Sequence, residues 1–305
     1  MGSVPGQHRF HHSAGLMLLA ANKLRHAVRG YRRPRPFPVT EFERAVDYDL
    51  GVVAAWRRRL RDYLGRDHEL AGQRVLELGP GADLGVGLHL LQLGAARYDA
   101  FDVHNLAVAA PRAFYDRLLA RLQEIERSGT DMRIDRTEFE RQLDRALRGE
   151  GDRLHYVCRP DFDLAVFGER TIDLVVSQAA FEHFDDVAAV MRGLSRIVKP
   201  GGLLVAEIDL QTHTRWIRER DPLNIYRYGD GVYDLFRFRG SPNRARPGEY
   251  AAHLAEHGWE RVVIVPDRVA DEAYVASVRP ALAARFRGEG ESLGYLSIYV
   301  CATKS

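Results

Sequence analysis

The sequence VLELGPGADLGVGL, residues 75–88, places a glycine-rich turn between two apolar segments. The apolar run at 74–79 is typical of a strand, and the segment at 85–94 is typical of a helix. Gly79 and Gly81 allow a tight turn and a close approach of the backbone to a ligand above the helix N-terminus. The stretch therefore predicts a strand, a turn and a helix that together bind a nucleotide-like ligand.

Two common phosphate-binding patterns do not match this turn. The NAD fingerprint G-x-G-x-x-G requires a glycine where Leu84 stands, and no G-K-[ST] follows. Glu77, two residues before the first glycine, would also repel a pyrophosphate. S-adenosylmethionine has no phosphate and carries an ammonium and a sulfonium, so it is the better candidate. Asp102 lies 21 residues after Gly81, where related dinucleotide folds hold the ribose hydroxyls with an acid.

Strands alternate with helices along the rest of the chain, which predicts a parallel sheet covered on both faces. The expected fold is α/β, a doubly wound and mostly parallel seven-stranded sheet, with ligands beyond the carboxyl ends of the strands. Further strands are expected at 98–103, 154–158, 172–177, 202–210, 260–266 and 293–303, and helices at 107–148 and 186–198.

The N-terminal segment differs from the rest of the chain in charge. Residues 1–36 hold seven basic side chains and no acid, whereas the remainder has 37 basic and 42 acidic residues. Such an arm is suited to nucleic acid, a membrane surface or an acidic substrate, or it is a solvated or oligomer-building helix. We therefore divide the chain into this arm, a helical lead-in at 37–69 and a ligand-binding domain at 70–305, and leave a homo-oligomer open.

Composition places the chain among ordinary globular proteins. Its 305 residues are 46% hydrophobic and 28% charged, enough for one large domain with additions. No apolar run approaches the roughly 20 residues of a membrane span, and no signal-peptide pattern is found, so a cytoplasmic protein is expected. Cys158 and Cys301 both lie in strand-like runs, which gives no support to a disulfide framework or a zinc cluster.

Four motifs over residues 70–210 resemble the class I S-adenosylmethionine-dependent methyltransferases: LELGPG, FDV, IDLVVSQAAFEHF and RIVKPGGLLVAEI. The resemblance implies a Rossmann-like methyltransferase that uses S-adenosylmethionine as cofactor. By the same resemblance, Glu77, Gly79 and Gly81 surround the methionine moiety, Asp102 holds the ribose, Asp161 or Phe162 approaches the adenine, and Ser177 and Gln178 line the methyl-donor site.

The acceptor is expected to be a small molecule. No N-P-P-[YF] motif follows the fourth strand, and neither cysteine is placed to attack a cytosine, so DNA is not the expected substrate. Two insertions, 107–148 and 211–246, extend the domain; the second is rich in aromatic and basic residues and is interpreted as a lid. Within it, Arg227, Asn243 and Arg244 are candidates for binding an acidic or polyhydroxylated acceptor, or else a solvated surface.

A hydroxyl acceptor needs a base, and two histidines follow predicted strands. His183 and His213 are the candidate catalytic residues, with Asp209 as a group that orients His213. Either histidine could instead be a packing or loop residue. Asp209 and His213 could also hold a divalent ion, but two ligands do not specify a metal site, and none is assigned.

The resulting hypothesis is O-methylation of a small polar metabolite, of sugar or secondary-metabolite type. Three alternatives remain: N-methylation of a small amine, a non-methylating reaction of S-adenosylmethionine such as cyclisation or aminopropyl chemistry, and a non-catalytic binding protein.

Overall fold

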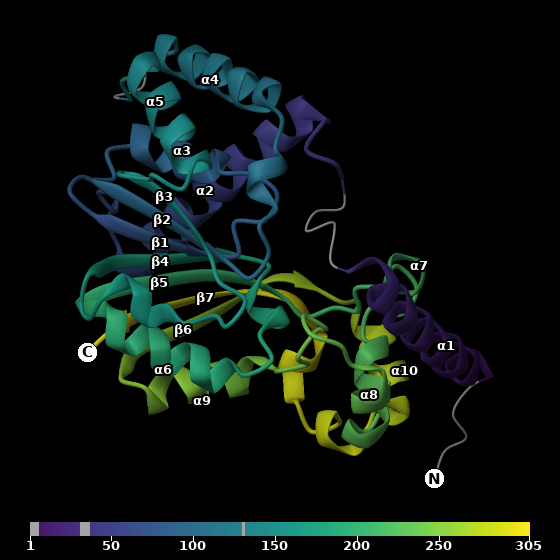
Figure 1. Cartoon of the computed structure of the whole chain (residues 1–305). Coiled ribbons are helices and arrows are strands. Elements are labelled where there is room, and N and C mark those ends of the chain that lie inside the picture. Colours follow the sequence, from purple (N-terminus) through teal and green to yellow (C-terminus); the bar gives the residue numbers. More distant parts are fainter. Residues whose placement is uncertain (1–5, 31–36, 130–131) are drawn as a thin grey trace.

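The computed structural model describes residues 6–30, 37–129 and 132–305, and its centre is a seven-stranded sheet (Figure 1). The strand order is β3-β2-β1-β4-β5-β7-β6, and β7 runs antiparallel to both of its neighbours. The expected doubly wound, mostly parallel sheet is confirmed. The strands are β1 (Arg74–Leu78), β2 (Arg97–Asp102), β3 (Leu154–Cys158), β4 (Ile172–Gln178), β5 (Val198–Asp209), β6 (Trp259–Val269) and β7 (Tyr295–Lys304).

Helices cover both faces of this sheet (Figure 1). One face is covered by α2 (Phe42–Leu64), α3 (Gly85–Gln92), α4 (Arg112–Arg127) and α5 (Arg136–Leu147), and the other by α6 (Val187–Ile197) and α9 (Pro247–Glu256). The remaining helices are α1 (Gly6–Arg29), α7 (Arg215–Arg218), α8 (Asp230–Phe236), α10 (Glu272–Val278), and the 3-10 helices η1 (Ala107–Ala109), η2 (Leu164–Phe167), η3 (Phe181–His183), η4 (Asn224–Arg227), η5 (Arg279–Ala281), η6 (Ala284–Phe286) and η7 (Gly290–Gly294).

The amphipathic pattern of α6 shows how the sequence sets these layers. Val187, Val190, Met191 and Leu194 recur at helical spacing and are all buried against the sheet. The side chain of Asp186 accepts a hydrogen bond from the amide of Ala189 at 2.8 Å and so caps the first turn. The helix therefore begins where its apolar face begins.

A third apolar cluster lies apart from the two cores of the sheet and joins three distant segments. It contains Leu223, Tyr226, Val278 and Phe286, and Leu16 of α1 packs against it. We call the three segments together, α1 with 211–246 and 270–294, the cap. The sequence patterns predict the second segment as a lid but do not predict the third.

Two expectations concern the ends of the chain and its cysteines. Of the basic arm at 1–36, the structure describes residues 6–30. Within the described part, no helix is long and apolar enough to cross a membrane. Cys158 and Cys301 are free thiols, the first half-buried and the second buried.

Candidate active site

The carboxyl ends of β1, β2, β3 and β4 open into a cavity of about 740 Å³. Gly79 and Gly81 line it with φ angles of 76° and 78°, in the left-handed region that favours glycine. A Cβ on Gly79 would lie 2.6 Å from the Cβ of Ala180, which no real side chain tolerates. Glycine at this position therefore lets the ends of β1 and β4 approach each other beside the cavity.

Glu77 lies on β1 at the floor of this cavity and is only 2% exposed. Its carboxylate accepts a hydrogen bond from the hydroxyl of Tyr98, and burial together with Glu77 raises the pKa of Tyr98 well above its usual range. The Tyr98 ring fits only because residue 87 is glycine: a Cβ there would lie 2.2 Å from a ring carbon. A carboxyl group is thus held in a fixed position inside the cavity.

Asp102 ends β2, the strand that pairs with β1, and also lines the cavity. Its carboxylate accepts the amide N–H of His104 at 2.9 Å. Burial raises the pKa of Asp102, although this hydrogen bond opposes the shift. One carboxylate oxygen is therefore anchored, and the group lies where the spacing from Gly81 predicts a ribose-binding acid.

The two residues expected near an adenine differ in character. Phe162 has a φ of 53°, and its ring lies 4.8 Å from those of both Phe101 and Phe184. Asp161 is exposed and forms an ion pair with Arg159 at 2.6 Å. Both residues line the cavity, but Phe162 offers the apolar surface that an adenine ring needs.

The two residues expected beside the methyl donor also differ. Gln178 lines the cavity, donates to Glu207 Oε2 at 3.3 Å, and has a buried Oε1 with no hydrogen-bond partner among the described residues. Ser177 is fully buried, and its hydroxyl donates to the carbonyl of Leu78 at 2.9 Å. Ser177 therefore ties β4 to β1 and does not line the cavity, which corrects the expectation for this residue.

The two candidate catalytic histidines stack on each other, and of the two only His183 lines this cavity. Their ring centroids are 4.8 Å apart and the rings are inclined by 21°. His183 lines the cavity, and its Nδ1 lies 2.6 Å from the carbonyl oxygen of Gly240 in the cap. His213 Nε2 lies 3.7 Å from Asp209 Oδ2, as the spacing of the two residues suggests.

The charges around these histidines are unusual. Burial, followed by the proximity of His213, lowers the pKa of His183 to about 4. Burial acts to raise the pKa of Asp209, but His213 and Arg218 together lower it to about 2. Burial and Asp209 raise the pKa of the neighbouring Glu207 to about 8. The cluster is therefore largely buried and holds more than one acidic side chain.

The structure corrects the expectation for the three candidate acceptor-binding residues. None of them lines the cavity, because each is engaged by the protein itself. Asn243 donates to the carbonyls of Phe181 and Phe184 at 2.8 and 3.1 Å. Arg244 donates to the carbonyl of Tyr228 at 2.6 Å and to Asp230 at 2.5 Å.

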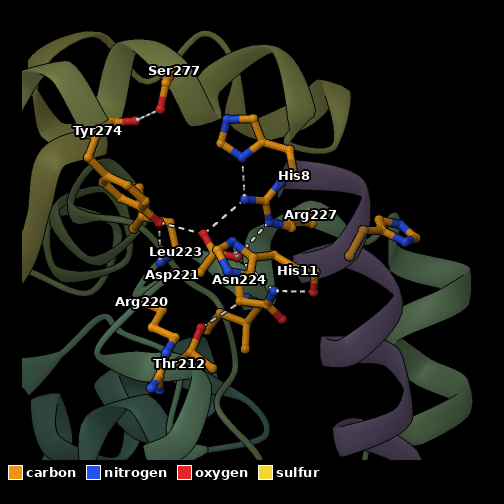
Figure 2. Close-up of polar contacts among 12 residues, drawn as sticks. His8, His11, Thr212, Arg220, Asp221, Leu223, Asn224, Arg227, Tyr274 and Ser277 are labelled. Atoms are coloured by element: carbon orange, nitrogen blue, oxygen red, sulfur yellow. Dashed lines mark hydrogen bonds and ion pairs between the residues drawn. The ribbon is translucent and has the colours of Figure 1, made fainter. Parts of the chain in front are cut away.

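Arg227 belongs to a buried polar network that docks α1 onto the rest of the cap (Figure 2). It pairs with Asp221 at 2.7 Å with both side chains fully buried, and it contacts His8 Nδ1 at 3.0 Å. Asn224 donates to the carbonyl of His11 at 2.9 Å. A Cβ on Gly15 would lie 2.0 Å from Asn224 Oδ1, so glycine allows this close contact.

Sequence reasoning missed two residues of this region. Arg239 of the cap lines the cavity and donates to the carbonyl of Pro160 in the loop after β3, so it reaches across the opening. Glu182, beside His183, is a buried carboxylate next to His213. The sequence Glu-His after the fourth strand could have predicted a role for Glu182. No local sequence pattern predicts that Arg239 lines the cavity.

The residues present fit S-adenosylmethionine. The cavity offers a buried carboxylate for an ammonium, a second carboxylate for ribose hydroxyls, and the apolar ring of Phe162 for an adenine. The unpartnered Oε1 of Gln178 is a further buried acceptor at the same place. The glycine turn carries no lysine for a phosphate, in keeping with a cationic ligand.

Comparison with known proteins agrees with this reading. Residues 120–206 match the family model described as methyltransferase domain. No curated protein sequence matches the chain. The chain is also similar to three solved structures, at TM-scores below 0.5.

The first is the CurJ carbon methyltransferase, at 15% identity and a TM-score of 0.47, covering 96% of this chain and 67% of that one. The second is an S-adenosylmethionine dependent methyltransferase from Mesorhizobium loti, at 18% identity and a TM-score of 0.43, covering 81% of this chain and 96% of that one. The third is phosphoethanolamine N-methyltransferase 2 from Haemonchus contortus, in complex with S-adenosyl-L-methionine. Its identity is 14% and its TM-score 0.44, and the match covers 85% of this chain and 52% of that one. The match of residues 120–206 to a methyltransferase domain, the strand order and the acidic, glycine-lined cavity are all in keeping with the resemblance to class I S-adenosylmethionine-dependent methyltransferases.

Proposed function

We propose that the protein methylates a hydroxyl of a small polar acceptor, which binds at the end of the cavity formed by Gln178, His183 and the cap residue Gly240. The observation that carries the proposal is the hydrogen bond between His183 and Gly240. It fixes a histidine at the cavity wall in a form that can accept a proton.

Three residues hold the cofactor in this proposal. Glu77 faces the ammonium, Asp102 accepts hydrogen bonds from the ribose hydroxyls, and Phe162 packs against the adenine. S-adenosylmethionine supplies an electrophilic methyl group on its sulfonium. Because Glu77 and Asp102 are both anchored by the protein, little has to reorganise when the cofactor binds.

His183 is the proposed base. A carbonyl oxygen can only accept, so the 2.6 Å contact means that Nδ1 carries the hydrogen and donates it to Gly240. Nε2 then has a free lone pair, and it takes the hydroxyl proton while the acceptor oxygen bonds to the methyl carbon and the carbon–sulfur bond breaks. His213 stacks on His183 and is paired with Asp209, so we assign it a positioning role.

The cap excludes water in this proposal. Arg239 connects the cap to the loop after β3, and α1 lies against the rest of the cap. We assign the methyltransferase to residues 70–305, with 37–69 as a helical support and 1–36 as an arm whose helix α1 completes the cap. Exclusion of water strengthens the charge interactions in the cavity and prevents hydrolysis.

The test is steady-state kinetics on an acceptor found by screening small hydroxylated compounds. His183→Asn should lower kcat by about 10²- to 10⁴-fold, the usual contribution of a general base, with S-adenosylmethionine affinity nearly unchanged. His213→Asn should have a smaller effect on kcat. His253→Asn, on the distant helix α9, is the matched control and should leave kcat unchanged.

Other outcomes separate the alternatives. A near-normal kcat in both His183→Asn and His213→Asn would favour an amine acceptor that arrives deprotonated. Methylthioadenosine as product, in place of S-adenosylhomocysteine, would indicate aminopropyl or cyclisation chemistry. Binding of S-adenosylmethionine without any product would indicate a binding protein.

A further inference from the structure

We infer that Glu182, His183 and His213 form a binding site for a divalent transition-metal cation. One ligand atom from each side chain lies within 4.8 Å of the other two. Glu182 and His183 lie in η3 after β4, and His213 follows β5. Because β4 and β5 are parallel neighbours, their carboxyl ends bring the three side chains together.

The carboxylate of Glu182 is the strongest sign of a ligand. Its residue is 2% exposed, and neither carboxylate oxygen has a hydrogen-bond partner among the described residues. His213 Nδ1 is likewise buried without a hydrogen-bond partner in that part of the chain. Buried polar groups of proteins are nearly always hydrogen-bonded, so buried groups without a partner point to a ligand. A cation between them would satisfy the carboxylate and an imidazole at once.

The surrounding charges favour a cation as that ligand. Glu207 and Asp209 add two more acidic side chains next to the cluster. Arg218 and Arg268 lie 2.6 and 3.8 Å from Asp209, so their positive charges are directed to that carboxylate. Glu182 is 3.9 Å from His213 Nε2, its nearest described cationic candidate. A divalent ion would offset the repulsion among the acids.

The supporting contacts also match those of a metal site. Metal-binding histidines usually donate their second ring N–H to a carbonyl or carboxylate, which fixes the ring. His183 does so to Gly240. The segment around Glu182 is held by Asn243, whose amide N–H donates to the Glu182 carbonyl at 2.7 Å and whose side chain donates to the carbonyls of Phe181 and Phe184. This assigns Asn243 a positioning role.

The donor set selects the class of metal. Two imidazoles and one carboxylate suit zinc, iron, cobalt or nickel, whereas magnesium and calcium prefer oxygen ligands. Cation binding itself does not depend on the proposed function. With a cation bound, His183 Nε2 would be a ligand and not the base of the proposed function; the cation would instead acidify an acceptor hydroxyl that it contacts, and the hydroxyl proton would pass to solvent as the oxygen bonds to the methyl carbon.

The test is calorimetric titration of the chelator-treated full chain with Zn²⁺ alone, and with Co²⁺ followed by visible absorption. Wild type should bind about one equivalent, and Co²⁺ should give the absorption of a site with nitrogen and oxygen ligands. Glu182→Gln and His213→Asn should each weaken Zn²⁺ binding by at least about 10- to 100-fold and lose the Co²⁺ signal. His253→Asn removes a histidine elsewhere and should bind as wild type does.

Glu182→Gln keeps the shape of the side chain and removes a buried acid, so it should fold, and far-UV circular dichroism checks this. Absence of saturable Zn²⁺ and Co²⁺ binding in wild type would overturn the inference, as would unchanged binding in both variants. The methyl-transfer assay is separate. Binding without O-methylation contradicts the proposed function alone, and O-methylation by a chain that binds no metal contradicts this inference alone.

Discussion

The cofactor side of the cavity and the cap that faces it are built in different ways. On the cofactor side, Gly79, Glu77 and Asp102 lie at the ends of adjacent strands, and the register of the sheet places them. In the cap, position depends on buried polar contacts between residues far apart in the sequence, such as Arg227 and His8, 219 residues apart. The cofactor side is therefore fixed by the backbone, whereas the cap is fixed by side chains and can be undone by changing one of them.

The largest effect is expected from Asp221→Ala in the cap. Removing this carboxylate leaves Arg227 buried without its partner, which typically costs about 3–5 kcal/mol. Hydrogen exchange should show loss of protection in α1 and η4, while calorimetry should show S-adenosylmethionine binding largely retained. Asp234→Ala, an exposed residue of α8 whose nearest ion-pair contact is 4.0 Å from Arg237, is the control. If S-adenosylmethionine binding and the hydrogen-exchange protection of α1 are lost together, the cofactor side and the cap do not depend on separate interactions.

The converse change is Asp102→Ala on the cofactor side. It should weaken S-adenosylmethionine binding by about 1–3 kcal/mol, the usual cost of losing a hydrogen bond to a charged group. Protection of α1 should not change. Glu77→Gln keeps a hydrogen-bond acceptor for Tyr98 and should weaken S-adenosylmethionine binding through the lost charge. Asp116→Ala, on the surface of α4, is the control. Unchanged affinity in both Asp102→Ala and Glu77→Gln would remove the cofactor assignment.

The smallest effect is a pH response of the cap. Burial, followed by the proximity of Arg227, lowers the pKa of His8, while Asp221 opposes and His11 adds to the shift. Undocked α1 therefore takes up a proton more readily than docked α1. Docking should be fully stable above the ordinary histidine pKa of about 6.5 and should weaken as the pH falls below it. Hydrogen exchange of α1 at neutral and mildly acidic pH measures this loss of docking. His8→Gln should remove the pH dependence, and an equal pH dependence in that variant would contradict the assignment to His8.

The same contrast explains what the sequence could predict. The turn at Gly79 and Gly81 and the spacing to Asp102 are local patterns in the sequence. They therefore predicted the unit formed by β1, α3 and β2, and they predicted the cofactor. The hydrogen-bond partners of side chains on neighbouring strands could not be predicted from the sequence. Ser177 was therefore expected to line the cavity, although its hydroxyl donates to the carbonyl of Leu78. In the cap, Arg227 was expected to meet an acceptor because its partner Asp221 and the approach of α1 are set only by tertiary packing.

The docking of α1 has a consequence for biosynthesis. This helix leaves the ribosome before the other described elements, and Asn224, which donates to the carbonyl of His11, lies 213 residues after His11. At typical synthesis rates the helix waits on the order of ten seconds or more for that partner. During this time the side chains that later pack on the cap stay uncovered, beside Phe10, Met17 and Leu24, which remain exposed even when the chain is complete. Strands β1 to β5 precede Asn224 in the chain, so they can pair before α1 docks, and nascent chains are most prone to aggregate before that docking.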